Sequence, residues 1–132
     1  MIVVDASAVV VALADDGLPG RKVRRRIEGQ PLVAPHLIDA EVVSAWRRLV
    51  AAGDLSTERA ELGLAALSDL PMTRVPHSKL LARCWELRSN VTTYDALYVA
   101  LAEFLDVPLM TSDDRLVRSP GSRCAFIRLQ DL

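Results

Sequence analysis

Short runs of apolar, often β-branched residues alternate along this chain with longer segments in which apolar positions recur at helical spacing. Short continuous apolar runs bounded by turn residues are typical of buried strands, and the 3.6-residue spacing is typical of amphipathic helices. Strands are predicted at Ile2–Val4, Leu32–Ala34, Met72–Val75, Pro108–Met110 and Ala125–Arg128. Helices are predicted at Ala6–Ala14, Arg21–Glu28, His36–Ala52, Ser56–Leu70, Ser78–Arg88 and Thr93–Leu105.

This alternation of strands and helices predicts an α/β fold, a three-layer α/β/α sandwich around a mostly parallel five-stranded sheet. Short parallel strands need helices on both faces of the sheet, and the predicted helices are sufficient to cover them. The 132 residues contain no repeat, linker or low-complexity segment. We therefore expect a single domain over residues 1–132.

Composition narrows the class of protein. Hydrophobic residues make up 51% of the chain and charged residues 25%, values that suit a globular protein with its own core. The formal net charge of −1 argues against a general nucleic-acid coat but permits a local basic patch. Cys84 and Cys124 lack the spacing of a zinc pair and indicate a reducing compartment. The N-terminus carries Asp5 within its apolar run and no basic segment before it, so we expect a cytoplasmic protein without a membrane span.

Two acidic residues directly follow predicted strands. Asp5 comes after the first strand, and Asp113, with Asp114 beside it, follows the fourth through Thr111 and Ser112. Each has an ordinary explanation, because an aspartate at the start of a helix accepts hydrogen bonds from free backbone N–H groups. In parallel sheets, however, the carboxyl ends of the strands form the edge at which ligands bind. Both positions are therefore candidate site residues.

Two further acids lie in apolar helices. Glu41 borders the apolar stripe of its helix, where a partly buried carboxylate needs either an ion pair, for instance with Arg48, or a role as a ligand. Asp95 opens a strongly apolar helix, and Thr92-x-x-Asp95 also fits a capping box. If the first strand is central, the acids at positions 5, 41, 95 and 113 can converge at one edge of the sheet. Crowded carboxylates raise one another's pKa unless a cation is present, and Mg²⁺ suits a set of oxygen ligands, with Mn²⁺ as a substitute.

Four segments in order carry a resemblance to a known family. They are Met1-Ile-Val-Val-Asp5-Ala-Ser7-Ala, Ala34-Pro35-His36-Leu37-x-x-Ala40-Glu41, Tyr94-Asp95-Ala96-x-Tyr98-Val99-Ala100-x-Ala102 and Leu109-Met110-Thr111-Ser112-Asp113-Asp114-Arg115-Leu116. This ordered set resembles PIN-domain ribonucleases, specifically the VapC toxins of bacterial and archaeal toxin–antitoxin pairs. The resemblance covers essentially the whole chain.

The resemblance implies a metal-dependent endoribonuclease that hydrolyses RNA phosphodiester bonds and is neutralised by a cognate VapB-like antitoxin. It implies that Asp5, Glu41, Asp95 and Asp113 are the catalytic and metal-ligating acids, with Asp114 as an alternative to Asp113. It also implies supporting hydroxyls at Ser7 and Thr111 and a homodimer. Apolar helical positions between residues 55 and 70 (Leu62, Leu64, Ala65 and Leu67) are a candidate antitoxin surface.

Several of these residues also allow other interpretations. The segment Arg21–Arg26 holds five positive charges in six positions, which indicates either a solvated helix or phosphate contacts, with Arg47 and Arg48 as a possible extension. Trp46 and Trp85 favour core or a subunit interface over stacking on bases. A haloacid-dehalogenase-type phosphatase would need an acid where Ser7 stands. A catalytically silent PIN-like module that binds RNA or protein stays open as the alternative.

Overall fold

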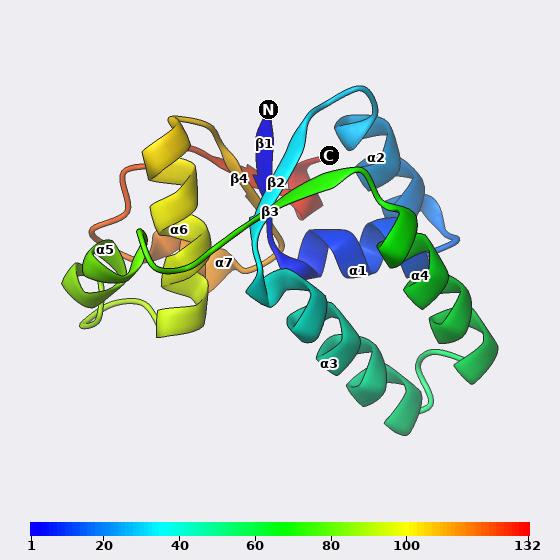
Figure 1. The fold of residues 1–132 in the computed structure, drawn as a ribbon. Coiled ribbons are helices and arrows are strands. Elements are labelled where there is room, and N and C mark those ends of the chain that lie inside the picture. Colours follow the sequence, from blue (N-terminus) through cyan, green and yellow to red (C-terminus); the bar gives the residue numbers. More distant parts are fainter.

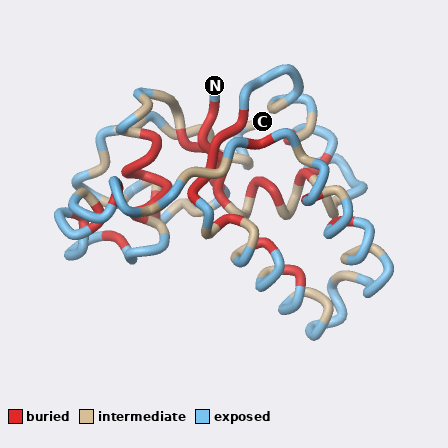
Figure 2. Tube along the Cα trace, viewed as in Figure 1, coloured by how far each residue is buried: buried red, intermediate tan, exposed pale blue.

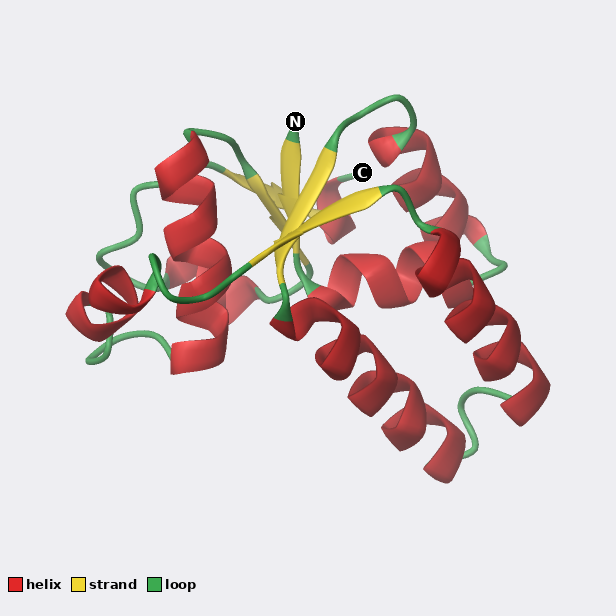
Figure 3. Cartoon of the chain, in the orientation of Figure 1, coloured by secondary structure: helices red, strands yellow, loops and turns green.

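The computed structural model describes all 132 residues and places a five-stranded sheet at the centre of the molecule (Figures 1 and 3). The strand order is β3-β2-β1-β4-β5, and every neighbouring pair is parallel. The strands are β1 (Ile2–Val4), β2 (Leu32–Pro35), β3 (Met72–Val75), β4 (Leu109–Thr111) and β5 (Phe126–Arg128). The prediction of an α/β fold with a five-stranded parallel sheet is confirmed.

Helices cover both faces of this sheet. They are α1 (Ala6–Ala14), α2 (Leu18–Ile27), α3 (Leu37–Ala51), α4 (Thr57–Asp69), α5 (Leu81–Glu86), α6 (Thr93–Leu105) and α7 (Asp114–Arg118), with a final 3₁₀ turn η1 (Leu129–Asp131). Helices α1 to α4 pack with one another on one side, and α5 packs with α6 on the other, as Figure 1 shows. The chain therefore forms the expected α/β/α arrangement. No helix is long and apolar enough to cross a membrane.

The core is densest where β1, β4 and α6 meet. All residues of β1 and β4 are buried, and so is the continuous run Ala96–Ala102 of α6 (Figure 2). Central parallel strands are shielded on both faces, which explains why their residues form continuous apolar runs rather than alternating ones. Because β1 is the middle strand of the sheet, the residue that follows it lies at the centre of the edge formed by the strand ends.

Two helix boundaries differ from the sequence prediction. Helix α2 begins at Leu18 rather than Arg21, because Pro19 is tolerated in a first helical turn, where its missing N–H would have no partner. Gly20 fits there because a Cβ atom would stand 1.9 Å from the carbonyl oxygen of Asp15. Helix α5 is shorter than predicted, since residues 78–80 form a turn that precedes it.

The two tryptophans have different environments. Trp46 is 2% exposed and belongs to the core, and its ring packs directly on Gly63 of α4, where a side chain would collide with it. Trp85 is 69% exposed, and its ring stacks with the guanidinium of Arg88 at 4.6 Å. Core packing is thus confirmed for Trp46 and excluded for Trp85, for which a subunit interface stays a prediction.

Candidate active site

Asp5 stands at the end of the central strand and begins α1. Its backbone N–H donates to the carbonyl of Met110 at 3.2 Å, which ties it to the neighbouring strand β4. Its carboxylate Oδ1 accepts hydrogen bonds from the Ser7 hydroxyl at 2.5 Å and from the Ala8 N–H at 3.1 Å. The capping role predicted for Asp5 is therefore real, yet its side chain also lies at the edge where ligands bind to parallel sheets.

The charge of Asp5 is costly where it lies. Burial raises the pKa of its carboxyl group, and the nearby charge of Asp95 raises it further. Hydrogen bonds from Ser7, Thr111 and the Ala8 N–H oppose that rise without cancelling it. All three donors are neutral, so no positive charge of the protein compensates this carboxylate. Ser7 also accepts a hydrogen bond from the Ser112 N–H at 2.9 Å, which links the start of α1 to the loop after β4.

Asp95 occupies the first turn of α6 and neighbours the other three acids. The Thr92 hydroxyl accepts from the Asp95 N–H at 3.4 Å, as the predicted capping box requires. The Asp95 Oδ2 accepts from the same hydroxyl at 3.1 Å, whereas in a capping box it would accept from the Thr92 N–H. Burial raises the pKa of Asp95, and the charge of Asp113 adds to the effect, partly opposed by the Thr92 hydrogen bond and the charge of Arg115. The charge of Asp95 in turn raises the pKa of both Asp5 and Glu41. Asp95 is therefore the common neighbour of the set.

Glu41 projects from α3, and its partner is Tyr98 of α6. The Tyr98 hydroxyl donates to Glu41 Oε1 at 2.7 Å. Burial raises the pKa of Glu41, and this hydrogen bond only partly offsets the effect. The ion pair with Arg48, which the sequence left open, does not form, because the Arg48 guanidinium donates to Ser44 at 3.0 Å instead.

The carboxylates of Asp113 and Asp114 have different hydrogen-bond partners. Asp113 caps α7 by accepting from the N–H groups of Arg115 and Leu116 at 2.8 and 3.2 Å. The Asp114 carboxylate accepts from Arg128 at 2.8 Å and from Gln130 at 2.6 Å, which draws it toward β5 and η1. Because Asp113 is the one whose charge reaches Asp95, the geometry favours Asp113 over Asp114 as the fourth acid.

The four acids form a loose set rather than a closed cage. No group of three or more carboxylate, imidazole or thiolate side chains is arranged so that it could hold a metal ion by itself. Such an open set fits Mg²⁺, which commonly takes one or two carboxylates and keeps several waters. The donors are all oxygen atoms, and Asp5, Glu41, Asp95 and Asp113 take part in no salt bridge. The residues present therefore fit a hard divalent cation.

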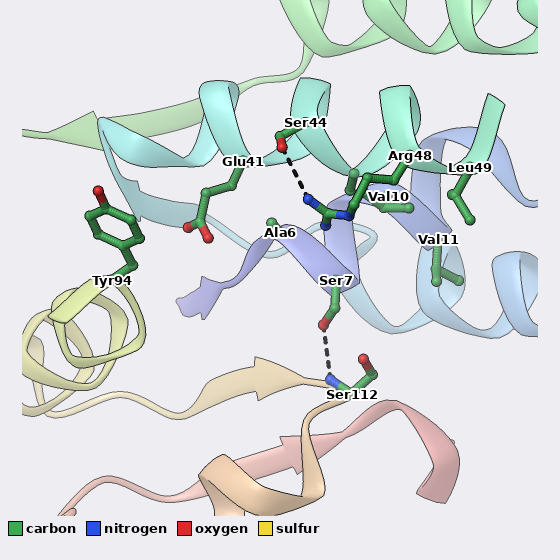
Figure 4. A pocket seen from close by; sticks show the side chains of 11 residues that line it. Ala6, Ser7, Val10, Val11, Glu41, Ser44, Arg48, Leu49, Tyr94 and Ser112 are labelled. Carbon is green, nitrogen blue, oxygen red and sulfur yellow. Dashed lines mark hydrogen bonds between the residues drawn. The ribbon is translucent and has the colours of Figure 1, made fainter. Parts of the chain in front are cut away.

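A cavity of about 590 Å³ opens beside Glu41, between α1, α3 and the start of α6 (Figure 4). Its polar lining comes from Ser7, Glu41, Ser44, Arg48, Tyr94 and Ser112, and Ala6, Val10, Val11, Ala45 and Leu49 provide apolar walls. Figure 4 shows the Arg48 guanidinium and the Glu41 carboxylate two turns apart on α3, both directed into this space. The cavity thus combines an acidic end with a cation about two helical turns away.

The basic residues of α2 are largely occupied by backbone contacts. Arg24 donates to the carbonyls of Ala12 and Asp15 at 2.9 and 2.8 Å, which caps the end of α1. Lys22 donates to the carbonyl of Leu132, and Arg21 to that of Asp16. Arg25 and Arg26 are exposed. Three of the five charges thus have structural contacts, and whether any of them meets phosphate stays a prediction.

Tyr98 is the site residue that the sequence reading missed. It belongs to a continuous apolar stretch of α6 and is 1% exposed, so its pattern is that of a core aromatic. The available signal was its spacing: a residue three positions after Asp95 lies on the same face of the helix. Burial, the hydrogen bond to Glu41 and the charges of Asp5 and Asp95 together raise the pKa of Tyr98, so its hydroxyl keeps its proton.

Comparison with known proteins gives consistent results. Residues 2–121 match the PIN domain family. Ribonuclease VapC1 of Mycobacterium tuberculosis is 51% identical over 123 residues, which are 92% of either chain. Two solved structures share the fold at low identity. The Mycobacterium tuberculosis toxin VapC20, described as cleaving the sarcin–ricin loop, has a TM-score of 0.68 and 13% identity over 89% of this chain and 93% of that one. A toxin–antitoxin complex from Klebsiella pneumoniae has a TM-score of 0.63 and 15% identity over 98% of each chain.

Proposed function

Because this chain belongs to the PIN-domain family and, within it, to the VapC proteins, we propose that it is an endoribonuclease toxin that depends on Mg²⁺ or Mn²⁺ and hydrolyses RNA phosphodiester bonds. The observation that carries the proposal is the environment of Asp95. Three other carboxylates lie close enough for their charges to interact with that of Asp95, none of the four has an arginine or lysine in a salt bridge, and a cavity opens beside them.

The proposed role of the acids is to hold the cation. Asp5 and Asp95 are the best direct ligands, because Asp5 ends the central strand with no positive charge acting on it and Asp95 interacts with the charges of the other three acids. Glu41 and Asp113 complete the set directly or through water. Bound there, a divalent ion promotes deprotonation of water and neutralises negative charge that develops on the phosphate.

The remaining residues bind and orient the substrate in this proposal. Arg48 stands in the cavity with no carboxylate partner, so its guanidinium is available to the RNA phosphate backbone. Ser7 and Thr111 keep the Asp5 carboxylate in place from either side. The apolar walls formed by Val10, Val11 and Leu49 exclude water from one side of the bound segment.

We also propose that a cognate antitoxin silences this enzyme and that the chain forms a homodimer. The relatives named VapC and the toxin–antitoxin complex that shares the fold support the first point. Leu62 and Leu64 of α4 are 64% and 41% exposed, as a partner surface requires, whereas Leu67, also predicted for that surface, is buried in the core.

Co-expression with the neighbouring reading frame, followed by size-exclusion chromatography with light scattering, tests both points. Recovery of a bare monomer would contradict them.

The central experiment is an RNA-cleavage assay on the isolated chain. Cellular tRNA, rRNA and mRNA pools are incubated with Mg²⁺, Mn²⁺ or EDTA, beside the variant Asp95→Asn. We expect discrete cleavage with metal only, and a loss of at least about 100-fold in Asp95→Asn, because replacing a ligand should cost at least as much as disturbing its outer partners. Asp39→Asn is the control, since Asp39 pairs with Arg74 away from the set.

A silent binding module is the alternative outcome. Folded wild-type protein that retains RNA on a filter but cleaves none of the pools in any metal would show that the acids bind without catalysis. Cleavage that continues in EDTA and in Asp95→Asn would reject the metal mechanism instead.

A further inference from the structure

The hydrogen bond between Tyr98 and Glu41 connects the two helices that carry site acids from opposite faces of the sheet. Tyr98 lies on α6 with its ring in the core, and Glu41 lies on α3 beside the cavity. The two atoms are 2.7 Å apart, a normal length for a hydroxyl that donates to a carboxylate. A core tyrosine usually satisfies its hydroxyl with a partner, but this partner is one of four acids at the candidate site.

Nothing else in the structure holds the Glu41 carboxylate. Glu41 takes part in no salt bridge, and the nearest cation on its own helix, Arg48, donates to Ser44. A glutamate side chain has several rotatable bonds, and ordering it costs conformational entropy. Tyr98 has two, and burial of its ring leaves the hydroxyl little freedom to move. The orientation of Glu41 therefore depends on Tyr98.

The Tyr98 hydroxyl has three carboxylates near it but donates to only one. Asp5 and Asp95 are close enough for their charges to act on Tyr98, but a phenol has one proton and donates it to Glu41 alone. Only Oε1 of Glu41 is engaged, so Oε2 stays available. In water-mediated or direct contact with a cation, a carboxylate with one oxygen fixed and the other free is a pre-ordered ligand.

We propose that Tyr98 is a positioning residue for the metal site: its hydroxyl holds Oε1 of Glu41 and thereby presents Oε2 to the divalent cation. The inference rests on the proposed function and adds to it a residue that contacts neither the RNA nor the ion. It makes α6 responsible for two parts of the site, through Asp95 directly and through Glu41 by way of Tyr98.

The test measures Mn²⁺ binding to the metal-free protein by electron paramagnetic resonance of the free ion, with no RNA present. The proteins are wild type, Tyr98→Phe, Glu41→Gln and the double variant. We expect Tyr98→Phe to bind Mn²⁺ about tenfold more weakly, the usual effect of removing an outer-shell partner of a ligand. The double variant should bind as Glu41→Gln does, because without the carboxylate the hydroxyl has nothing left to position.

Wild-type affinity in Tyr98→Phe would overturn the inference. So would a double variant that binds more weakly than Glu41→Gln by the full factor lost in Tyr98→Phe, because Tyr98 would then act independently of Glu41. If Tyr98→Phe does not fold, the double variant still tests the inference, because weaker Mn²⁺ binding than in Glu41→Gln would show that Tyr98 acts independently of Glu41. Thermal unfolding of each variant shows which comparison applies.

Tyr94→Phe is the matched control for the loss of a hydroxyl from the same helix. Tyr94 also borders the cavity, but it is 62% exposed and donates to none of the four acids, so this variant should keep the wild-type Mn²⁺ affinity. A separate variant, Asp95→Asn, tests the proposed metal site itself. If Asp95→Asn binds Mn²⁺ as tightly as wild type, the proposed function is wrong. If Asp95→Asn loses Mn²⁺ and Tyr98→Phe retains it, only the role of Tyr98 is wrong.

Discussion

Two groups of acids in this chain differ in the kind of side chain that holds them. Asp16, Asp39, Glu103 and Asp114 each accept hydrogen bonds from an arginine, namely Arg59, Arg74, Arg83 and Arg128. The site acids, Asp5, Glu41, Asp95 and Asp113, accept only from hydroxyls and backbone N–H groups. The first group supports the fold with charge pairs, whereas no arginine or lysine pairs with the second group.

This difference shows in the pKa values. Burial raises the pKa of Asp5, Glu41 and Asp95, and neutral donors do not reverse it. Burial acts on Glu103 in the same direction, but hydrogen bonds from Arg83 and from the Arg123 N–H outweigh it and hold the pKa below its usual value. Carboxylates without a positive partner lower the free energy of unfolding of the metal-free protein, as is expected if the proposed site binds a cation.

The largest effect should separate the two neighbouring aspartates that belong to different groups. Asp113→Asn should lower metal-dependent RNA cleavage at least about tenfold, because it removes a charge near Asp95 while asparagine still caps α7. Asp114→Asn should change cleavage less than about twofold, since its carboxylate only joins Arg128 and Gln130. Initial rates on one RNA pool measure both, and the reverse order would assign the fourth acid to Asp114.

A second experiment compares the same carboxylate-to-amide change in each group by its effect on folding. Glu103→Gln should lower the free energy of unfolding by about 2 kcal/mol, because it weakens two hydrogen bonds from the mostly buried Arg83. Asp95→Asn in metal-free protein should leave that free energy unchanged or raise it. Urea denaturation at neutral pH measures both. Equal destabilisation by the two variants would remove the distinction between the groups.

The smallest effect is the pH dependence of those differences. A carboxyl with a lowered folded pKa contributes stability above its unfolded pKa and loses it as the pH falls, so the deficit of Glu103→Gln should shrink below about 4.5. A carboxyl with a raised folded pKa is unfavourable once it ionises in the folded state, so any advantage of Asp95→Asn should vanish as the pH falls below 3.8. Urea denaturation of metal-free protein from neutral pH down to about pH 3 measures both effects. The free energy of unfolding of Glu103→Gln should approach that of wild type from below, and that of Asp95→Asn from above.

Local sequence signals predicted most of the fold. Apolar runs at the strands and Gly or Pro at the breaks located all five strands within about one residue, and the parallel sheet followed from their alternation with helices. The predictions failed where a contact outside the element decides. Helix α2 begins at Leu18, three residues before the predicted start at Arg21, and Gly20 in its first turn packs against the Asp15 carbonyl. No local pattern predicted the pair between Asp39 and Arg74 of β3, which joins positions 35 residues apart.

The candidate site divides in the same way. Local patterns locate three of the acids: Asp5 and Asp113 follow apolar strands, and Asp95 opens a helix in a capping pattern. The sequence alone was therefore enough to predict them at one edge of the sheet. Folding decided the partners: Tyr98 rather than Arg48 for Glu41, and Arg128 for Asp114. Periodicity and capping depend on residues within one turn of each other and can be read along the chain. A hydrogen bond across 57 residues depends on how two helices pack against the sheet, which only the tertiary structure determines.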